Sequence, residues 1–173
     1  MSEGLTVAGL IAGAALLQST VFSSLEIAGG TPDLLLVTLL GISLLRGSVT
    51  GAVAGFCGGL LVDVMTLDTL GVTALLYALA GYWVGRYGET TGRDRTHAPF
   101  LSVGVVTILY AFGAMVVHYM LGEDVSARRA LFDTLLPGLG LNLLLAAPVF
   151  MLCRRVLGRD QLTGRVQEVR LLG

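Results

Sequence analysis

Residues 51–63 read Gly-Ala-Val-Ala-Gly-Phe-Cys-Gly-Gly-Leu-Leu-Val-Asp. Within this stretch Gly51, Gly55 and Gly59 recur at intervals of four, and the carboxylate of Asp63 continues the series. On an α-helix this spacing places all four residues along one stripe. Each glycine costs roughly 1 kcal/mol of helix stability relative to alanine, but in membranes small residues let a second helix approach closely. The stretch therefore predicts a packing face in a membrane protein, with Asp63 at its outer end.

The composition supports this interpretation. The chain has 173 residues, of which 54% are hydrophobic and 13% are charged, and its mean hydropathy is +0.82. Soluble domains contain about 25% charged residues. Several apolar runs approach the roughly 20 helical residues that cross a hydrocarbon core. The net charge of −1 gives no field that would attract nucleic acid, so the sequence predicts an all-α integral membrane protein.

We expect a single transmembrane domain in residues 1–153, followed by a cytoplasmic tail, 154–173. Its six predicted helices cover about residues 5–22, 32–45, 49–65, 70–87, 99–121 and 131–152. The first apolar run is kept as a span because no basic segment precedes it and it exceeds the apolar region of a typical signal peptide.

The second span is the shortest. Leu34–Leu45 extends only about 18 Å as a helix, so it forms either a short crossing or a re-entrant half-helix. Pro32 suits the first turn of a helix. We place Asp33 in that turn, where a carboxylate complements the helix dipole.

Two further glycine pairs have GxxxG spacing: Gly9 and Gly13 in the first span, and Gly81 and Gly85 in the fourth. Such pairs are typical of close helix contacts in membranes. Together with the stripe of residues 51–63, they predict a groove for the transmembrane helix of a partner. The sequence does not decide whether these glycines face another span or a separate protein.

Few polar residues lie at membrane depth. For Gln18 and Asn142 we favour hydrogen bonds to neighbouring helices over contacts with a ligand. Asp63 could bind a cation, a substrate amine or a partner's arginine. We favour a solvated position at the membrane interface, because it lies only about one turn from the following loop.

The sequence carries no signature of an enzyme. The serines lack a nucleophile motif, the glycine-rich segments lack the ending of a phosphate-binding loop, and the two histidines have no partner at metal-binding spacing. Cys57 and Cys153 are expected to be small buried hydrophobic residues. We therefore predict no catalytic residue, no cofactor and no metal site.

The basic residues predict the orientation. The chain has eleven arginines and no lysine. If the amino terminus is cytoplasmic, nine arginines lie inside and only Arg128 and Arg129 lie outside, as the positive-inside rule requires. The carboxy terminus is then cytoplasmic. If the second span does not cross, the amino terminus moves outside.

Several motifs occur in an order that resembles the rod shape-determining protein MreD family of bacteria. The resemblance is strongest over residues 14–88, whereas the fifth and sixth spans match only in hydropathy and length. The stretches that carry it are Leu16–Thr20, Pro32–Leu36, Arg46-Gly47, Gly51–Asp63, Leu70-Gly71 and Gly81–Gly85. The positions identified with family motifs are Gln18, Pro32, Asp33, Phe56, Leu70 and Gly71.

The resemblance implies a non-enzymatic scaffold in the cytoplasmic (inner) membrane that supports lateral peptidoglycan synthesis and rod shape. Its implied partners are MreC, bound through a transmembrane helix, MreB, the RodA glycosyltransferase and a class B penicillin-binding transpeptidase, besides membrane lipid. The implied fold is similar to the six-helix substrate-binding component of energy-coupling-factor transporters.

That likeness supplies the alternative function, a vitamin-binding component of such a transporter. A vitamin site needs several converging polar groups. The membrane-depth polar residues are few, which favours the scaffold, and they are Gln18, Thr38, Ser43, Thr73 and Asn142. An ion or proton carrier would place carboxylates in mid-span, and here they lie at the ends of spans.

Overall fold

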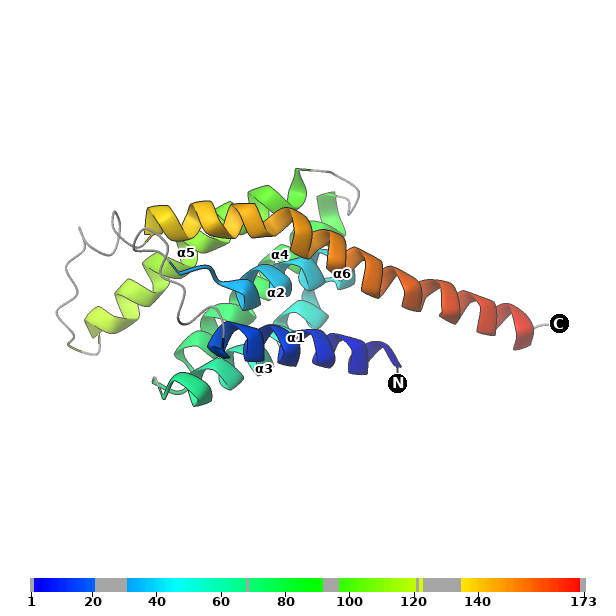
Figure 1. Cartoon of the computed structure of the whole chain (residues 1–173), viewed down its shortest axis with the longest axis horizontal. Coiled ribbons are helices and arrows are strands. Elements are labelled where there is room, and N and C mark those ends of the chain that lie inside the picture. Colours follow the sequence, from blue (N-terminus) through cyan, green and yellow to red (C-terminus); the bar gives the residue numbers. More distant parts are fainter. Residues whose placement is uncertain are drawn as a thin grey trace.

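The computed structural model describes residues 2–20, 31–67, 69–91, 97–120, 122 and 135–171. In this part of the chain all regular structure is helical (Figure 1). The six helices are α1 (Ser2–Thr20), α2 (Leu34–Arg46), α3 (Ser48–Thr66), α4 (Val72–Thr91), α5 (Ala98–Met120) and α6 (Leu136–Leu171). The predicted fold class, a six-helix all-α membrane protein, is confirmed at this level.

Three of the six helices are long and apolar enough to cross a membrane: α3, the Ala98–Val116 part of α5 and the Leu136–Leu157 part of α6. The apolar parts of α1 and α2, Gly4–Thr20 and Leu34–Arg46, are shorter. The described helices begin and end within a few residues of the predicted spans, except where α6 continues beyond residue 152.

The short helix α2 occupies the centre of the bundle. It contacts all five other helices, and every residue from Leu35 to Leu44 is buried. A helix that is apolar on all sides must be covered on all sides, which explains the run of leucines. At 13 residues it is roughly 20 Å long, shorter than the hydrocarbon core of about 30 Å. The other helices therefore surround α2.

The antiparallel helices α3 and α4 form the closest contact in the described structure. A Cβ atom added at Gly51, Gly55 or Gly59 would lie closer than 3.0 Å to the backbone of α4. The same holds in the opposite direction for Gly81 and Gly85, which meet the backbone at Gly51 and Ser48. The glycine stripe of residues 51–63 therefore faces another span of the same chain.

Helix α1 packs differently. It contacts α2, α3 and, more weakly, α6, and its buried side chains are Ile11, Ala14 and Ala15. Nothing lies within 4 Å of a Cβ atom added at Gly9 or Gly13. The first GxxxG pair thus takes no part in the packing of the described residues.

Helix α6 is one continuous element of 36 residues, with Pro148 inside it. It continues through most of the predicted tail, and its C-terminal part extends beyond the other helices (Figure 1). The N-terminal end of α1 and the C-terminal end of α6 lie at the same end of the bundle (Figure 1). The tail is therefore an extension of the last membrane helix.

The contact between α3 and α4 predicts which glycines tolerate a methyl group. Gly55→Ala should lower the free energy of unfolding by about 1–3 kcal/mol, because overpacking forces the two backbones apart. Gly9→Ala is the matched control and should leave stability unchanged or slightly higher. Thermal unfolding of the purified protein in one detergent measures both effects. Equal stability of the two variants would contradict the observed packing.

Candidate functional site

Polar side chains from several helices converge where α2 begins. They are Gln18 of α1, Asp33 preceding α2, Tyr77 of α4, Thr107 of α5 and Asn142 of α6, and hydrogen bonds connect them to one another or to the backbone at this point. The sequence predicts few polar groups at membrane depth. The structure shows that two of them, Gln18 and Asn142, converge with three further polar side chains.

The amide of Gln18 holds the backbone just before α2. Its Nε2 donates to the carbonyl oxygen of Pro32 over 3.0 Å, and its Oε1 accepts from the Leu34 N–H over 2.7 Å. Both ends of one amide are therefore satisfied by one short segment. The predicted hydrogen bond from Gln18 to a neighbouring helix is present, and its partner is the backbone at the start of α2.

Asp33 is the N-cap residue of α2 and not part of its first turn, because the helix begins at Leu34. Its Oδ1 accepts from the Leu36 N–H over 2.9 Å, which satisfies a donor that the helix itself leaves unpaired. Its Oδ2 accepts from the hydroxyl of Tyr77. One carboxylate thus caps α2 and links it to α4.

Asn142 connects α6 to two other parts of the bundle. Its Oδ1 accepts from the backbone N–H of Asp33 over 2.7 Å, and its Nδ2 donates to Oγ1 of Thr107 over 3.2 Å. Asn142 is 3% exposed, and a buried amide costs stability unless it is paired. The expected helix–helix hydrogen bond is therefore present, between α6 and α5.

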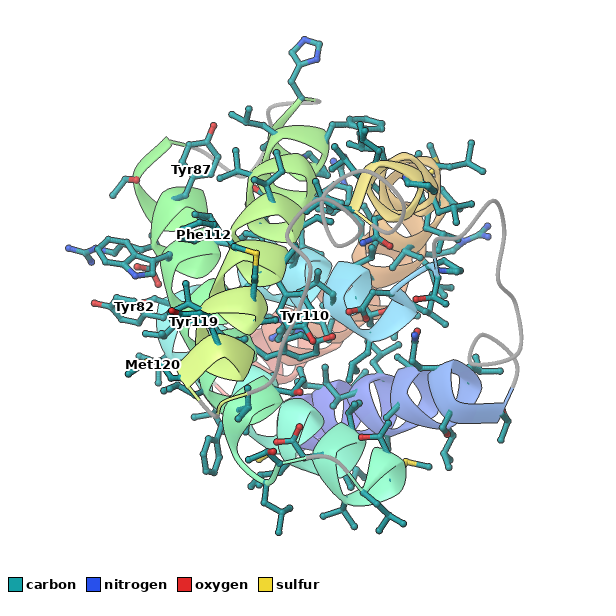
Figure 2. All side chains as sticks on the ribbon, turned by 90° about the vertical axis from the view of Figure 1, so that its left-hand side faces the viewer. Tyr82, Tyr87, Tyr110, Phe112, Tyr119 and Met120 are labelled. Atoms are coloured by element: carbon teal, nitrogen blue, oxygen red, sulfur yellow. The ribbon has the colours of Figure 1, made fainter. Side chains whose placement is uncertain are left out.

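These polar groups line a cavity of about 460 Å³. Much of the remaining lining is apolar, including Leu36, Val62, Met65 and Ala111. The rings of Tyr77 and Tyr110 lie 5.4 Å apart at the same cavity, and Figure 2 shows Tyr110 in the middle of the bundle, with Tyr82 at its periphery. A space of this kind suits a mostly apolar molecule with a few polar groups.

The sequence did not identify Tyr77 or Thr107 as site residues. The available signal was position, since both are polar side chains within otherwise apolar helices. In an apolar interior such groups need a partner, and here Asp33 and Asn142 provide it. Spacing along one helix did not reveal the pairing, because each partner belongs to a distant segment.

Asp63 is buried, with 1% exposure, which corrects the expectation of a solvated interfacial residue. Its Oδ2 accepts from the Gly71 N–H over 2.7 Å and, more weakly, from the Ala74 N–H over 3.4 Å. The carboxylate therefore caps the N-terminus of α4, where it also complements the helix dipole. Its Oδ1 has no hydrogen-bond partner among the described residues.

Glu89 forms the corresponding cap at the opposite end of the α3–α4 pair. The N-cap of α3, Gly47, offers no side-chain cap. Instead, Oε1 of Glu89 accepts from the Ser48 N–H over 2.8 Å, and the Ser48 hydroxyl donates to the same carboxylate. A carboxylate side chain of each helix thus caps the N-terminus of the other helix.

The remaining family-motif residues and the two cysteines lie either inside the bundle or on its outer surface. Pro32 is buried beside Gln18, and Gly71, at φ +95°, donates to Asp63. Phe56 and Leu70 are exposed, by 50% and 67%, so they lie on the outer surface. Cys153 is buried as expected, whereas Cys57 is exposed, which corrects the expectation for that residue.

The Glu89 cap predicts a dependence of stability on pH. The hydrogen bond from the Ser48 N–H lowers the pKa of Glu89 below its ordinary value of 4.5. A lowered pKa stabilises the fold above that value, and the stabilisation disappears as the pH falls through the folded-state pKa. Glu89→Gln should therefore melt at a lower temperature than the wild type at pH 7, and the difference should shrink as the pH falls below 4.5 and Glu89 becomes protonated.

Arg86→Gln is the control for this measurement. Arg86 forms an ion pair of 3.6 Å with Glu89, and its own side chain is 60% exposed. Exposed pairs of this type contribute little, so the melting temperature should change little at either pH. A larger loss in Arg86→Gln than in Glu89→Gln would show that the ion pair, and not the cap, matters.

Comparison with known proteins places this chain in a family. The profile of the family described as rod shape-determining protein MreD matches residues 3–156, from α1 to the middle of α6. The match includes the fifth helix and the first part of the sixth, beyond the region where the sequence motifs are strongest. Searches of curated proteins and of solved structures gave no match. The chain belongs to the rod shape-determining protein MreD family.

Proposed function

We propose that this protein is a non-enzymatic scaffold in the bacterial cytoplasmic membrane that binds MreC and supports lateral peptidoglycan synthesis. The observation that carries the proposal is the family match over residues 3–156, which supports a role in rod shape. The helical bundle and its apolar helices are consistent with a membrane position. MreB, RodA and the class B transpeptidase belong to the larger proposed assembly.

The open face of α1 is the surface we assign to the helix of MreC. Gly9 is exposed and Gly13 is half-buried, and no described atom lies within 4 Å of a Cβ placed on either residue. Small residues at this spacing allow the backbone of a second helix to approach. The glycines of α3 and α4 already face each other, so they do not provide this surface.

The proposed orientation places both termini in the cytoplasm. Its basis is the excess of arginine in the loops on that side. The location of the ends of α1 and α6 at one end of the bundle (Figure 1) is compatible with it.

The assignment to α1 predicts an effect on MreC. Gly9→Leu combined with Gly13→Leu should reduce co-purification of MreC from native membranes at least tenfold, because the leucines keep the partner backbone at a distance. The amount of inserted protein should stay the same, since the substitutions meet open space. Quantitative mass spectrometry of the captured complex measures both quantities.

Gly140→Leu is the matched control. Gly140 is exposed on α6, and a Cβ atom there also meets nothing within 4 Å. This variant should retain MreC at the wild-type level. If the double variant of α1 retains MreC as well, the contact lies elsewhere.

A vitamin-binding component of a transporter is the second candidate, and the cavity of about 460 Å³ beside Asp33 and Asn142 favours it. The scaffold proposal predicts that riboflavin, thiamine and biotin do not bind at sub-micromolar concentration in equilibrium dialysis. Ala111→Phe fills the cavity, whereas Leu109→Phe changes an exposed position of α5. Tight binding that only Ala111→Phe abolishes would favour the second candidate.

A further inference from the structure

A second hollow lies between α1 and α3, separate from the cavity beside Asp33. It has a volume of about 570 Å³. On the α1 side it is lined by small and aliphatic residues such as Gly4, Ala8 and Ala12, and on the α3 side by Val49, Val53 and Leu61. We call it the α1–α3 groove. Among the lining residues, Arg46 carries a charge and Thr50 carries a hydroxyl group.

The polar groups lie at one end of the groove. Arg46 ends α2, and Thr50 lies in the first turn of α3, whereas Leu61 lies three turns further along α3. From Val49 to Leu61 the groove follows α3 for roughly 18 Å. One leaflet of the hydrocarbon core is about 15 Å deep. The groove therefore has the length of one leaflet, and among its described lining residues the charged side chain, that of Arg46, lies at one end.

The position of Arg46 is fixed by the bundle. Its Nη2 donates to the carbonyl oxygen of Leu157 in α6 over 3.2 Å, and the residue is half-buried. A guanidinium presents several N–H donors in a fixed plane, which suits the oxygens of a phosphate. An anionic headgroup at this end of the groove would thus meet a side chain that is already oriented.

From this arrangement we propose that the α1–α3 groove binds an anionic phospholipid, with one acyl chain along the groove and the phosphate at Arg46. The apolar walls match an acyl chain, and the charge at one end matches an anionic headgroup.

The test uses vesicles of phosphatidylcholine that contain a small fraction of phosphatidylglycerol with a photoreactive acyl chain. After illumination of the reconstituted wild-type protein, mass spectrometry should locate the crosslinks on the groove-lining residues of α1 and α3. Photoreactive phosphatidylcholine in the same vesicles should give at least fivefold fewer crosslinks there. This comparison needs no variant and therefore does not depend on folding.

Two variants then test the two halves of the site. Arg46→Gln should reduce the preference for phosphatidylglycerol about fivefold, the amount expected for one basic residue near an anionic lipid. Ala12→Phe fills the apolar part and should reduce crosslinking of both lipids. Arg154→Gln, which changes an exposed arginine of α6 outside the groove, should leave the preference unchanged.

Three outcomes would overturn the proposal. Equal crosslinking of the two lipids in the groove would show that Arg46 does not select an anionic headgroup. An unchanged preference in Arg46→Gln would do the same. Crosslinks that disappear from the groove when MreC is added would show that a protein helix, and not a lipid, is the occupant.

Discussion

The backbone contact between α3 and α4 is the constraint on which the rest of the fold depends. Three glycines of α3 and two of α4 allow the helices to meet without intervening side chains. Any methyl group in this row would push the two backbones apart. At this separation the carboxylates of Asp63 and Glu89 each reach the N-terminus of the other helix, so close packing and reciprocal capping reinforce each other.

This pair also makes the central position of α2 possible. Helix α2 is short and buried over ten consecutive residues, so its ends must find partners inside the bundle. Asp33 caps its first turn, Gln18 and Asn142 hold the segment before it, and the N–H of Gly47 donates to Ser43 at its end. Side chains of the neighbouring helices thus satisfy backbone groups that the ends of a helix leave unpaired.

Much of the architecture followed from the sequence, and the limits have a physical origin. Hydropathy predicted six helices, and the four-residue glycine spacing predicted close contact, because both depend on local geometry. The neighbour of each face depends on tertiary structure. Gly9–Gly13 and Gly81–Gly85 share one motif, yet only the second pair meets a helix of this chain. Asp63 lies close to a loop in the sequence, but its carboxylate is hydrogen-bonded to the backbone at the start of α4.

The same reasoning explains why sequence motifs did not reveal the cavity beside Asp33. The five side chains that converge there belong to four helices and to the segment before α2, and the hydrogen bonds that connect these helices join distant segments of the chain. Each was interpretable in the sequence only as a single residue that needed a hydrogen bond. A membrane protein can therefore build a polar site without a local signature, because the low dielectric of its interior makes scattered polar residues pair with one another.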